Sequence, residues 1–160
     1  MGKVLVTYFS ASGVTKRVAE KLASVAEAEL FEIQPEKKYT GQDLNWTDRN
    51  SRSSVEMNDR SSRPAISSRI DNISQYSHVF VGFPVWWYRE PSIIDTFMEM
   101  YDFSNITVIP FCTSGGSGIG DSGRNMQNLA SGAKVLSGKR LTANMSIEEL
   151  KRWIDEVVDE

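Results

Sequence analysis

The sequence predicts an α/β protein in which helices cover both faces of a parallel sheet. Short, nearly continuous apolar runs alternate along the chain with segments whose apolar residues recur at helical spacing. Continuous apolar runs are typical of strands covered on both faces, and their alternation with helices requires right-handed crossovers between parallel strands. With 160 residues, the chain is long enough for a three-layer core, and we expect a single domain spanning residues 1–160.

The chain begins with a strand, a short turn and a helix. Residues 3–9 form the predicted strand, because apolar residues are almost uninterrupted there. The helix is predicted over residues 14–26, where apolar positions lie three or four residues apart. A short strand over 29–33 follows and ends at Pro35. This arrangement places the turn at residues 10–15 at the amino end of a helix.

Residues 36–65 break this pattern, because they are polar and rich in Ser, Asn, Asp and Arg. A structureless loop of that length is uncommon in a compact domain, so the segment is expected to be functional or to contain short helices. One or two helical turns are expected over residues 51–58. One interpretation is a solvated excursion on the surface. The alternative is a cap that shapes one wall of a binding site, with Trp46 as its anchor.

The second half of the chain resumes the alternation. Pro110 cannot donate to a ladder, so the strand that contains it is expected to lose regular pairing near its end. The final helix is expected to begin with a capping box formed by Ser146 and Glu149. The expected elements are a short helix carried by Ile66, Ile70 and Ile73, a strand over 79–83, a helix from Pro91 to Tyr101, a strand over 106–111, a helix from Asp121 to Ala130, a strand over 134–136 and a last helix whose apolar face is Ile147, Leu150, Ile154 and Val157.

Composition excludes several classes of function. The chain has 18 Lys and Arg against 21 Asp and Glu, without a basic run, so neither nucleic acid nor an anionic membrane is an expected partner. One cysteine, Cys112, and one histidine, His78, leave too few ligands for a zinc or iron–sulfur site and exclude an internal disulfide. We expect a cytoplasmic protein, because the first strand begins at residue 3 and no apolar run approaches the roughly 20 residues that span a bilayer.

Three loops that follow predicted strands have the composition of a ligand site. In parallel sheets, ligands bind beyond the carboxyl ends of the strands, where these loops lie. The first loop is a hydroxyl-rich turn at a helix start, where unpaired N–H groups and the helix dipole favour an anion such as a phosphate monoester. An ordinary turn with serine caps is the alternative. The first loop consists of Ser10, Ala11, Ser12, Gly13, Val14 and Thr15.

The other two loops suit a flat heteroaromatic ring. Large aromatic side chains on a loop stack naturally on a planar ligand, although they also serve as core lids or interface anchors. Glycines let the backbone approach a ligand and donate N–H groups, although glycine runs are often simply flexible. The aromatic loop is Pro84, Val85, Trp86, Trp87 and Tyr88, and the glycine loop contains Thr113, Ser114, Gly115, Gly116 and Gly118.

These loops resemble those of the flavodoxin family. The run SASGVT at residues 10–15 resembles the family's phosphate loop, GFPVWW at 82–87 is similar to the flavin loop of one flavodoxin branch, and TSGG at 113–116 is similar to that branch's third loop. The resemblance implies noncovalently bound flavin mononucleotide (FMN) and a five-stranded sheet in the order 2-1-3-4-5. It also implies that the first loop takes the phosphate, that the aromatic loop flanks the ring and the ribityl chain, and that residues 113–118 line the other side.

The residues around these loops lead to further expectations. The aromatic loop lacks the glycine that, in the better studied flavodoxins, permits the peptide beside flavin N5 to flip on reduction. Arg89 and Glu90 follow this loop and are expected to form a solvated pair at the rim of the site or to contact a partner. Cys112 is expected to be a buried, inert thiol and His78 a structural residue.

The flavin implied by the resemblance would supply redox chemistry. An apolar site that already holds a phosphate disfavours a second negative charge, so we expect a low-potential carrier that exchanges electrons with redox partner proteins, a reductase and an acceptor. The alternative is an NAD(P)H-dependent reductase of a small quinone-like acceptor. The glycine spacing at 115–120 does not meet the dinucleotide pattern, which favours the carrier. A third possibility is a flavin-free interaction domain on the same scaffold.

Overall fold

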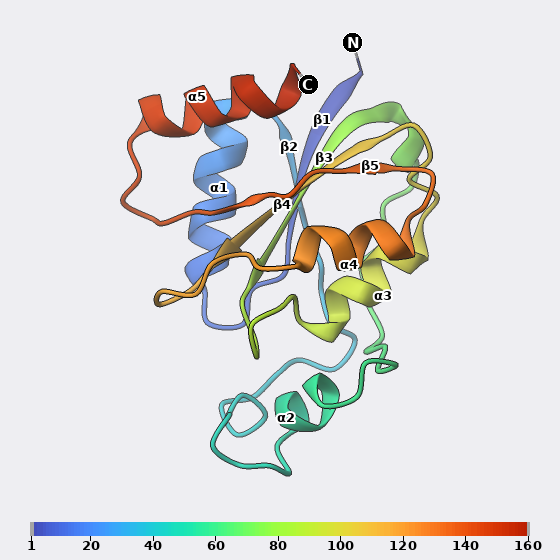
Figure 1. Cartoon of the computed structure of the whole chain (residues 1–160), viewed down its shortest axis with the longest axis vertical. Helices are drawn as coiled ribbons and strands as arrows, with labels where there is room; N and C mark the ends of the chain where they lie inside the picture. Colours follow the sequence, from blue (N-terminus) through green and yellow to red (C-terminus); the bar gives the residue numbers. More distant parts are fainter. Residues whose placement is uncertain (1, 160) are drawn as a thin grey trace.

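The computed structural model describes residues 2–159 and shows an α/β sandwich with three layers (Figure 1). The sheet has the strand order β2-β1-β3-β4-β5, and its pairings are parallel. This confirms the predicted fold class and strand order. A short strand that was not predicted, β6, pairs with β4 beyond the end of β5. The strands are β1 (Lys3–Tyr8), β2 (Glu29–Glu32), β3 (Tyr76–Pro84), β4 (Thr107–Thr113), β5 (Lys134–Val135) and β6 (Lys139–Arg140).

Helices cover both faces of the sheet, as Figure 1 shows. The α1 and α5 helices pack on one face over Val6 and Phe80, whereas α3 and α4 pack on the other face over Val79 and Val81. The short α2 helix lies apart from both layers, beyond the carboxyl edge of the sheet. The helices are α1 (Val14–Ala26), α2 (Arg52–Met57), α3 (Ser92–Met100), α4 (Ser122–Leu129) and α5 (Ile147–Val158), with a 3-10 turn, η1 (Ile73–Gln75).

The last helix, α5, shows how the apolar pattern and the packing differ. Its capping box of Ser146 and Glu149 is present as predicted. Ile147 was expected on the buried face but is 61% exposed, because it is the first helical residue and lies at the end of the contact with the sheet. Trp153 was not expected there, yet it is buried edge-on against Phe80, with 5.6 Å between the ring centroids.

The prediction of a short helix over residues 66–73 is wrong. Ile66 instead forms an antiparallel bridge with Pro35, and the Ser67 amide donates to the Gln34 carbonyl over 2.8 Å. This extended pairing satisfies backbone groups that a helix would pair internally. The helical turn that does form, η1, begins only at the end of the segment. Ile66 and Ile70 still pack against the core, but from an extended chain, and Ile73 does so from η1.

The expected loss of pairing near Pro110 occurs on one side of β4 only. Toward β3, the register continues without a break through Pro110 to the end of β4, so the expectation is wrong on that side. Toward the other edge, the partner strand is interrupted between β5 and β6, and Pro110 lies opposite this gap. Proline is tolerated there because no neighbouring strand requires the N–H that it lacks.

The structure also bears on the single cysteine, the single histidine, metal sites and membrane-spanning helices. Cys112 is completely buried in β4, and burial raises the pKa of its thiol to about 11. His78 is buried in β3, and burial lowers the pKa of its imidazole. Within residues 2–159, no group of His, Cys, Asp and Glu is placed to hold a metal ion. None of the described helices combines the length and the apolar character that crossing a membrane demands.

Candidate functional site

The three predicted loops come together at the carboxyl edge of the sheet. Thr15, in the first turn of α1, has its hydroxyl 2.7 Å from that of Thr113 at the end of β4. The Val85 amide donates to the Thr113 carbonyl over 3.0 Å. The Phe9 ring, just before the first loop, packs edge-on against Trp86 with 5.6 Å between centroids. Hydrogen bonds and ring packing thus join the first, aromatic and glycine loops at one place.

The first loop presents backbone donors at the start of α1. Gly13 has a φ of 96°, in the left-handed region that glycine adopts without steric cost, and it turns the chain into the helix. Ser10 Oγ accepts hydrogen bonds from the amides of Gly13 (3.1 Å) and Lys16 (3.2 Å). In the described part of the chain, the amides of Ser12 and Thr15 have no acceptor. These donors and the helix dipole favour an anion at this turn. Along the loop, Ser10, Ala11 and Gly13 are half-buried, Ser12 and Val14 are exposed, and Thr15 is buried.

The aromatic loop is a tight hairpin. The amides of Trp86 and Arg89 each donate to the other residue's carbonyl, over 3.0 and 3.2 Å. Between them, Trp87 and Tyr88 have φ values of 47° and 66°, the left-handed geometry of a type I′ turn. Left-handed geometry costs a residue with a Cβ about 1–2 kcal/mol. The loop therefore adopts a glycine-type backbone although it contains no glycine.

The aromatic rings of this hairpin have different environments. The half-buried Trp86 ring packs edge-on against Phe9 and Tyr39, with centroids 5.6 and 5.4 Å away. Trp87 is 37% exposed and Tyr88 is 82% exposed. Trp86 is thus fixed by neighbours, whereas the two rings at the tip of the turn extend toward solvent. Pro84 and Val85, which precede them, are half-buried.

The glycine loop is organised by Ser114. Its hydroxyl accepts a hydrogen bond from the Gly116 amide (3.3 Å), donates to the Ser117 carbonyl, and accepts from Arg140 Nε (3.1 Å). Arg140 comes from β6 and also donates to the Ser114 carbonyl. No local sequence pattern predicted this role. A Cβ on Gly115, Gly116 or Gly118 would meet nothing within 4 Å, so packing within the protein does not require glycine at these positions.

A cavity of about 430 Å³ lies between the aromatic loop, the glycine loop and the polar segment 36–65. The polar segment therefore forms one wall, as the cap interpretation predicted. Trp46 is 75% exposed and lines the cavity, so the expectation that it anchors the cap is wrong. The lining residues are Leu44, Trp46, Ser53, Val85, Trp86, Trp87, Tyr88 and Ser117.

Tyr39 and the α2 helix anchor the cap instead of Trp46. The Tyr39 hydroxyl donates to a Glu56 carboxylate oxygen, and the Arg52 guanidinium lies 3.8 Å from the centroid of the Tyr39 ring. Burial and the hydrogen bond to Glu56 raise the pKa of Tyr39. Arg89 Nη2 donates to the Met57 carbonyl over 3.3 Å, which joins the cap to the aromatic hairpin. The wall of the cavity is therefore tied to the same hairpin that carries the rings.

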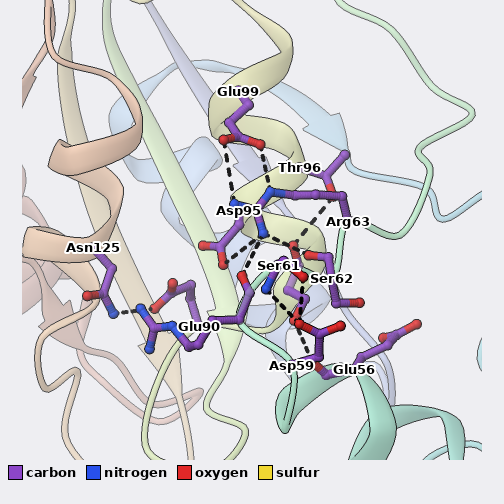
Figure 2. Close-up of polar contacts among 12 residues, drawn as sticks. Glu56, Asp59, Ser61, Ser62, Arg63, Glu90, Asp95, Thr96, Glu99 and Asn125 are labelled. Atoms are coloured by element: carbon purple, nitrogen blue, oxygen red, sulfur yellow. Dashed lines mark hydrogen bonds and ion pairs between the residues drawn. The ribbon is translucent and has the colours of Figure 1, made fainter.

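Arg89 and Glu90 are buried, so the expectation of a solvated pair or a partner contact at the rim is wrong. Arg89 is 7% exposed and Glu90 is completely buried. Figure 2 shows Glu90 and Asp95 among polar neighbours from distant segments, including Arg63 and Asn125. Asn125 Nδ2 donates to Glu90 Oε1 over 3.2 Å, and Arg89 Nη1 lies 3.5 Å from Asp95 Oδ2. Asp95 and Asn125 lie on two different helices, α3 and α4, and the local sequence does not reveal that both contact this pair.

The two carboxyls in this cluster are both buried, and the pKa of Asp95 is raised. Within the described structure, Glu90 Oε2 and Asp95 Oδ1 have no hydrogen-bond donor. Burial, and then the hydrogen bond with Glu90, raise the pKa of Asp95 to about 8. A proton on Asp95 would satisfy both of these oxygens and would allow the two acids to be buried side by side. The cluster stabilises the base of the hairpin and does not line the cavity.

Unpartnered amides at a helix start and an aromatic crevice at the carboxyl edge of a parallel sheet are typical of α/β proteins that bind nucleotides. The chain matches the family model described as Flavodoxin over residues 3–157, and it belongs to the flavodoxin family. No curated protein matches it significantly.

Three solved structures illustrate this relationship. A candidate flavoprotein from Bacteroides eggerthii DSM 20697 shares 42% identity and a TM-score of 0.93, with 99% of each chain covered. One from Bacteroides uniformis ATCC 8492 shares 46% identity and a TM-score of 0.90, covering 96% of this chain and 98% of that chain. A flavoprotein from Lactobacillus acidophilus NCFM, solved in complex with FMN, shares the fold at 24% identity and a TM-score of 0.74, covering 96% and 99%.

Membership of the flavodoxin family supports FMN as the cofactor. The residues present fit this group. Backbone amides without acceptors in the first loop suit a phosphate, which needs donors more than it needs a cation. The glycine loop leaves room where any side chain would project, and the aromatic loop offers a fixed indole at Trp86. Phosphate and ring would thus contact different loops of one site.

Proposed function

We propose that this protein binds FMN noncovalently and carries electrons at low potential between redox partner proteins. The observation that supports this proposal most strongly is the junction of the first loop with the aromatic cavity. An amide cradle and an aromatic wall are joined through Phe9, Trp86 and the Thr15–Thr113 contact. When bound, FMN supplies the redox chemistry, because its ring accepts one or two electrons.

The chain's own residues would bind and orient the cofactor. The amides of Ser12 and Thr15 would hold the phosphate at the start of α1. Trp86, held by Phe9 and Tyr39, would present a fixed aromatic surface to the ring. About thirty ligand atoms at about −0.3 kcal/mol each give about −9 kcal/mol, which corresponds to sub-micromolar retention.

The surroundings of the cavity favour a low potential. Most of its lining is apolar or aromatic, and none of the described residues that line it is a Lys or an Arg. A phosphate dianion in such a site disfavours further negative charge on a reduced ring. The exposed rings of Trp87 and Tyr88 would bring a redox partner close to the cofactor. Electron exchange with partner proteins would not require a binding site for NAD(P)H.

A second function has specific support. The cap closes one side of the cavity with Leu44, Trp46 and Ser53, as a substrate pocket would require. This observation favours an FMN-dependent reductase that uses NAD(P)H to reduce a small quinone-like acceptor. The carrier remains the preferred function because the glycine loop lacks a dinucleotide pattern.

Reductive titration of the purified protein with FMN, followed by visible spectroscopy, tests flavin binding and redox activity together. The expected result is a yellow protein that takes up electrons at low potential. A colourless protein whose melting temperature ignores added FMN would contradict both functions. A steady-state assay of NAD(P)H-dependent quinone reduction separates them, because robust turnover by the isolated protein would defeat the carrier proposal.

A further inference from the structure

Ser53 is the one cavity-lining residue that is buried in the described structure. It is 1% exposed, whereas the other lining residues are half-buried or exposed. Its hydroxyl oxygen has no hydrogen-bond partner among the described residues. An unsatisfied buried hydroxyl costs about 1–3 kcal/mol, so its position requires an explanation. The cavity that it lines is the place where a partner could approach.

Neighbouring serines of α2 show that the lack of a partner is specific to Ser53. Ser51 Oγ caps the helix by accepting a hydrogen bond from the Ser54 amide, and the hydroxyls of Ser51 and Ser54 lie 2.9 Å apart. The Ser53 amide is satisfied, because it donates to the Asp43 carbonyl over 3.0 Å. Only the hydroxyl of Ser53 is left without a partner in this run of serines.

The helix that carries Ser53 is held firmly in place. Ser92 Oγ at the start of α3 donates to the Glu56 carbonyl over 3.2 Å, and Arg89 donates to the Met57 carbonyl. Tyr39 also holds this helix, because its hydroxyl donates to Glu56 and its ring lies under the Arg52 guanidinium. These contacts come from three separate segments, so α2 cannot rotate Ser53 away from the cavity without breaking several of them. The hydroxyl is preorganised for a ligand.

We propose that Ser53 Oγ is a cofactor contact in the cap, where it hydrogen-bonds to the polar edge of the isoalloxazine ring. This assignment rests on the proposed binding of FMN. The ring combines an apolar benzenoid half with a pyrimidine half rich in carbonyl and nitrogen groups. A hydroxyl donates and accepts, so it can pair with either kind of atom. The indoles and aliphatic side chains around Ser53 suit the rest of the ring.

The test compares Ser53→Ala with Ser122→Ala. Ser122 is the matched control, because its hydroxyl is also buried and without a partner in the described structure but does not line the cavity. Fluorescence titration of the flavin-free full chain with FMN and with riboflavin gives the dissociation constants. We expect Ser53→Ala to weaken binding of both flavins by the same factor, about 3- to 10-fold, as the loss of one hydrogen bond predicts. Ser122→Ala should leave both constants unchanged.

Thermal melting of the flavin-free proteins supplies a second readout. Removing an unsatisfied hydroxyl should leave the melting temperature of Ser53→Ala equal to or above that of the parent. A lowered flavin-free melting temperature, or affinity within twofold of the parent, would overturn the assignment while leaving the proposed function intact. A parent protein that binds neither FMN nor riboflavin would overturn the proposed function and the assignment together.

Discussion

Replacing Asp95 by Asn should remove a pH dependence of stability that one buried carboxyl creates. Asp95 is 3% exposed, and burial together with Glu90 raises its pKa from the ordinary 3.8 to about 8. Arg89 and Arg63 oppose this shift, with guanidinium nitrogens 3.5 and 4.0 Å from Asp95 Oδ2. We therefore expect the folded protein to retain, at neutral pH, a proton that the unfolded chain has released.

The sign and size of the effect follow from this extra proton. Because the folded pKa lies above the unfolded pKa, the contribution of Asp95 to stability is fully present below about pH 4 and is lost as the pH rises to about 8. Each pH unit within this window removes about 1.4 kcal/mol, so the change from pH 5 to pH 8 amounts to about 4 kcal/mol. Asp95→Asn keeps a neutral donor toward Glu90 and does not titrate. The free energy of unfolding of Asp95→Asn, relative to that of the parent, should therefore increase with pH.

Urea unfolding of the flavin-free proteins at pH 5, 6, 7 and 8 measures this difference. With a denaturant slope of about 2 kcal/mol per molar urea, the gap between the two midpoints should widen by about 2 M across the series. Asp71→Asn, at an exposed carboxylate, is the control and should show no widening. A gap between parent and Asp95→Asn that stays constant from pH 5 to pH 8 would refute the proton assignment.

Three further substitutions test the loops and the sheet. Gly13→Ala places a Cβ at a φ of 96°, so thermal unfolding should show a loss of about 1 kcal/mol and fluorescence titration should show weaker binding of FMN than in the parent. Tyr88→Gly relieves left-handed strain in the hairpin and should raise the free energy of unfolding by about 1 kcal/mol in urea titrations; a destabilised variant would contradict the strain argument. Gly82→Ala would bring a Cβ within 2.1 Å of the Phe111 ring and should cost about 2 kcal/mol or more in the same assay, whereas Gly41→Ala, in open space, should cost little.

The ends of strands and the starts of helices were predictable from the sequence because they depend on neighbouring residues. Gly13 in the first loop and the Ser146–Glu149 capping box act within a single turn, and the structure contains both as predicted. The order of the sheet was inferred by resemblance, and the carboxyl edge of a parallel sheet is where its loops must gather. Strand periodicity therefore predicted where the three loops would gather.

The sequence by itself determined the three-layer fold, the hydroxyl-rich turn before α1 and the aromatic loop, because periodicity and turn chemistry are local. Only the tertiary structure decided that Arg89 and Glu90 are buried, since their partners Asp95 and Asn125 come from separate helices. It likewise decided that the polar segment forms a wall of the cavity and that Ser53 is its buried hydroxyl. Burial and pairing of polar groups depend on segments far apart in the chain, and local sequence patterns carry no information about such contacts.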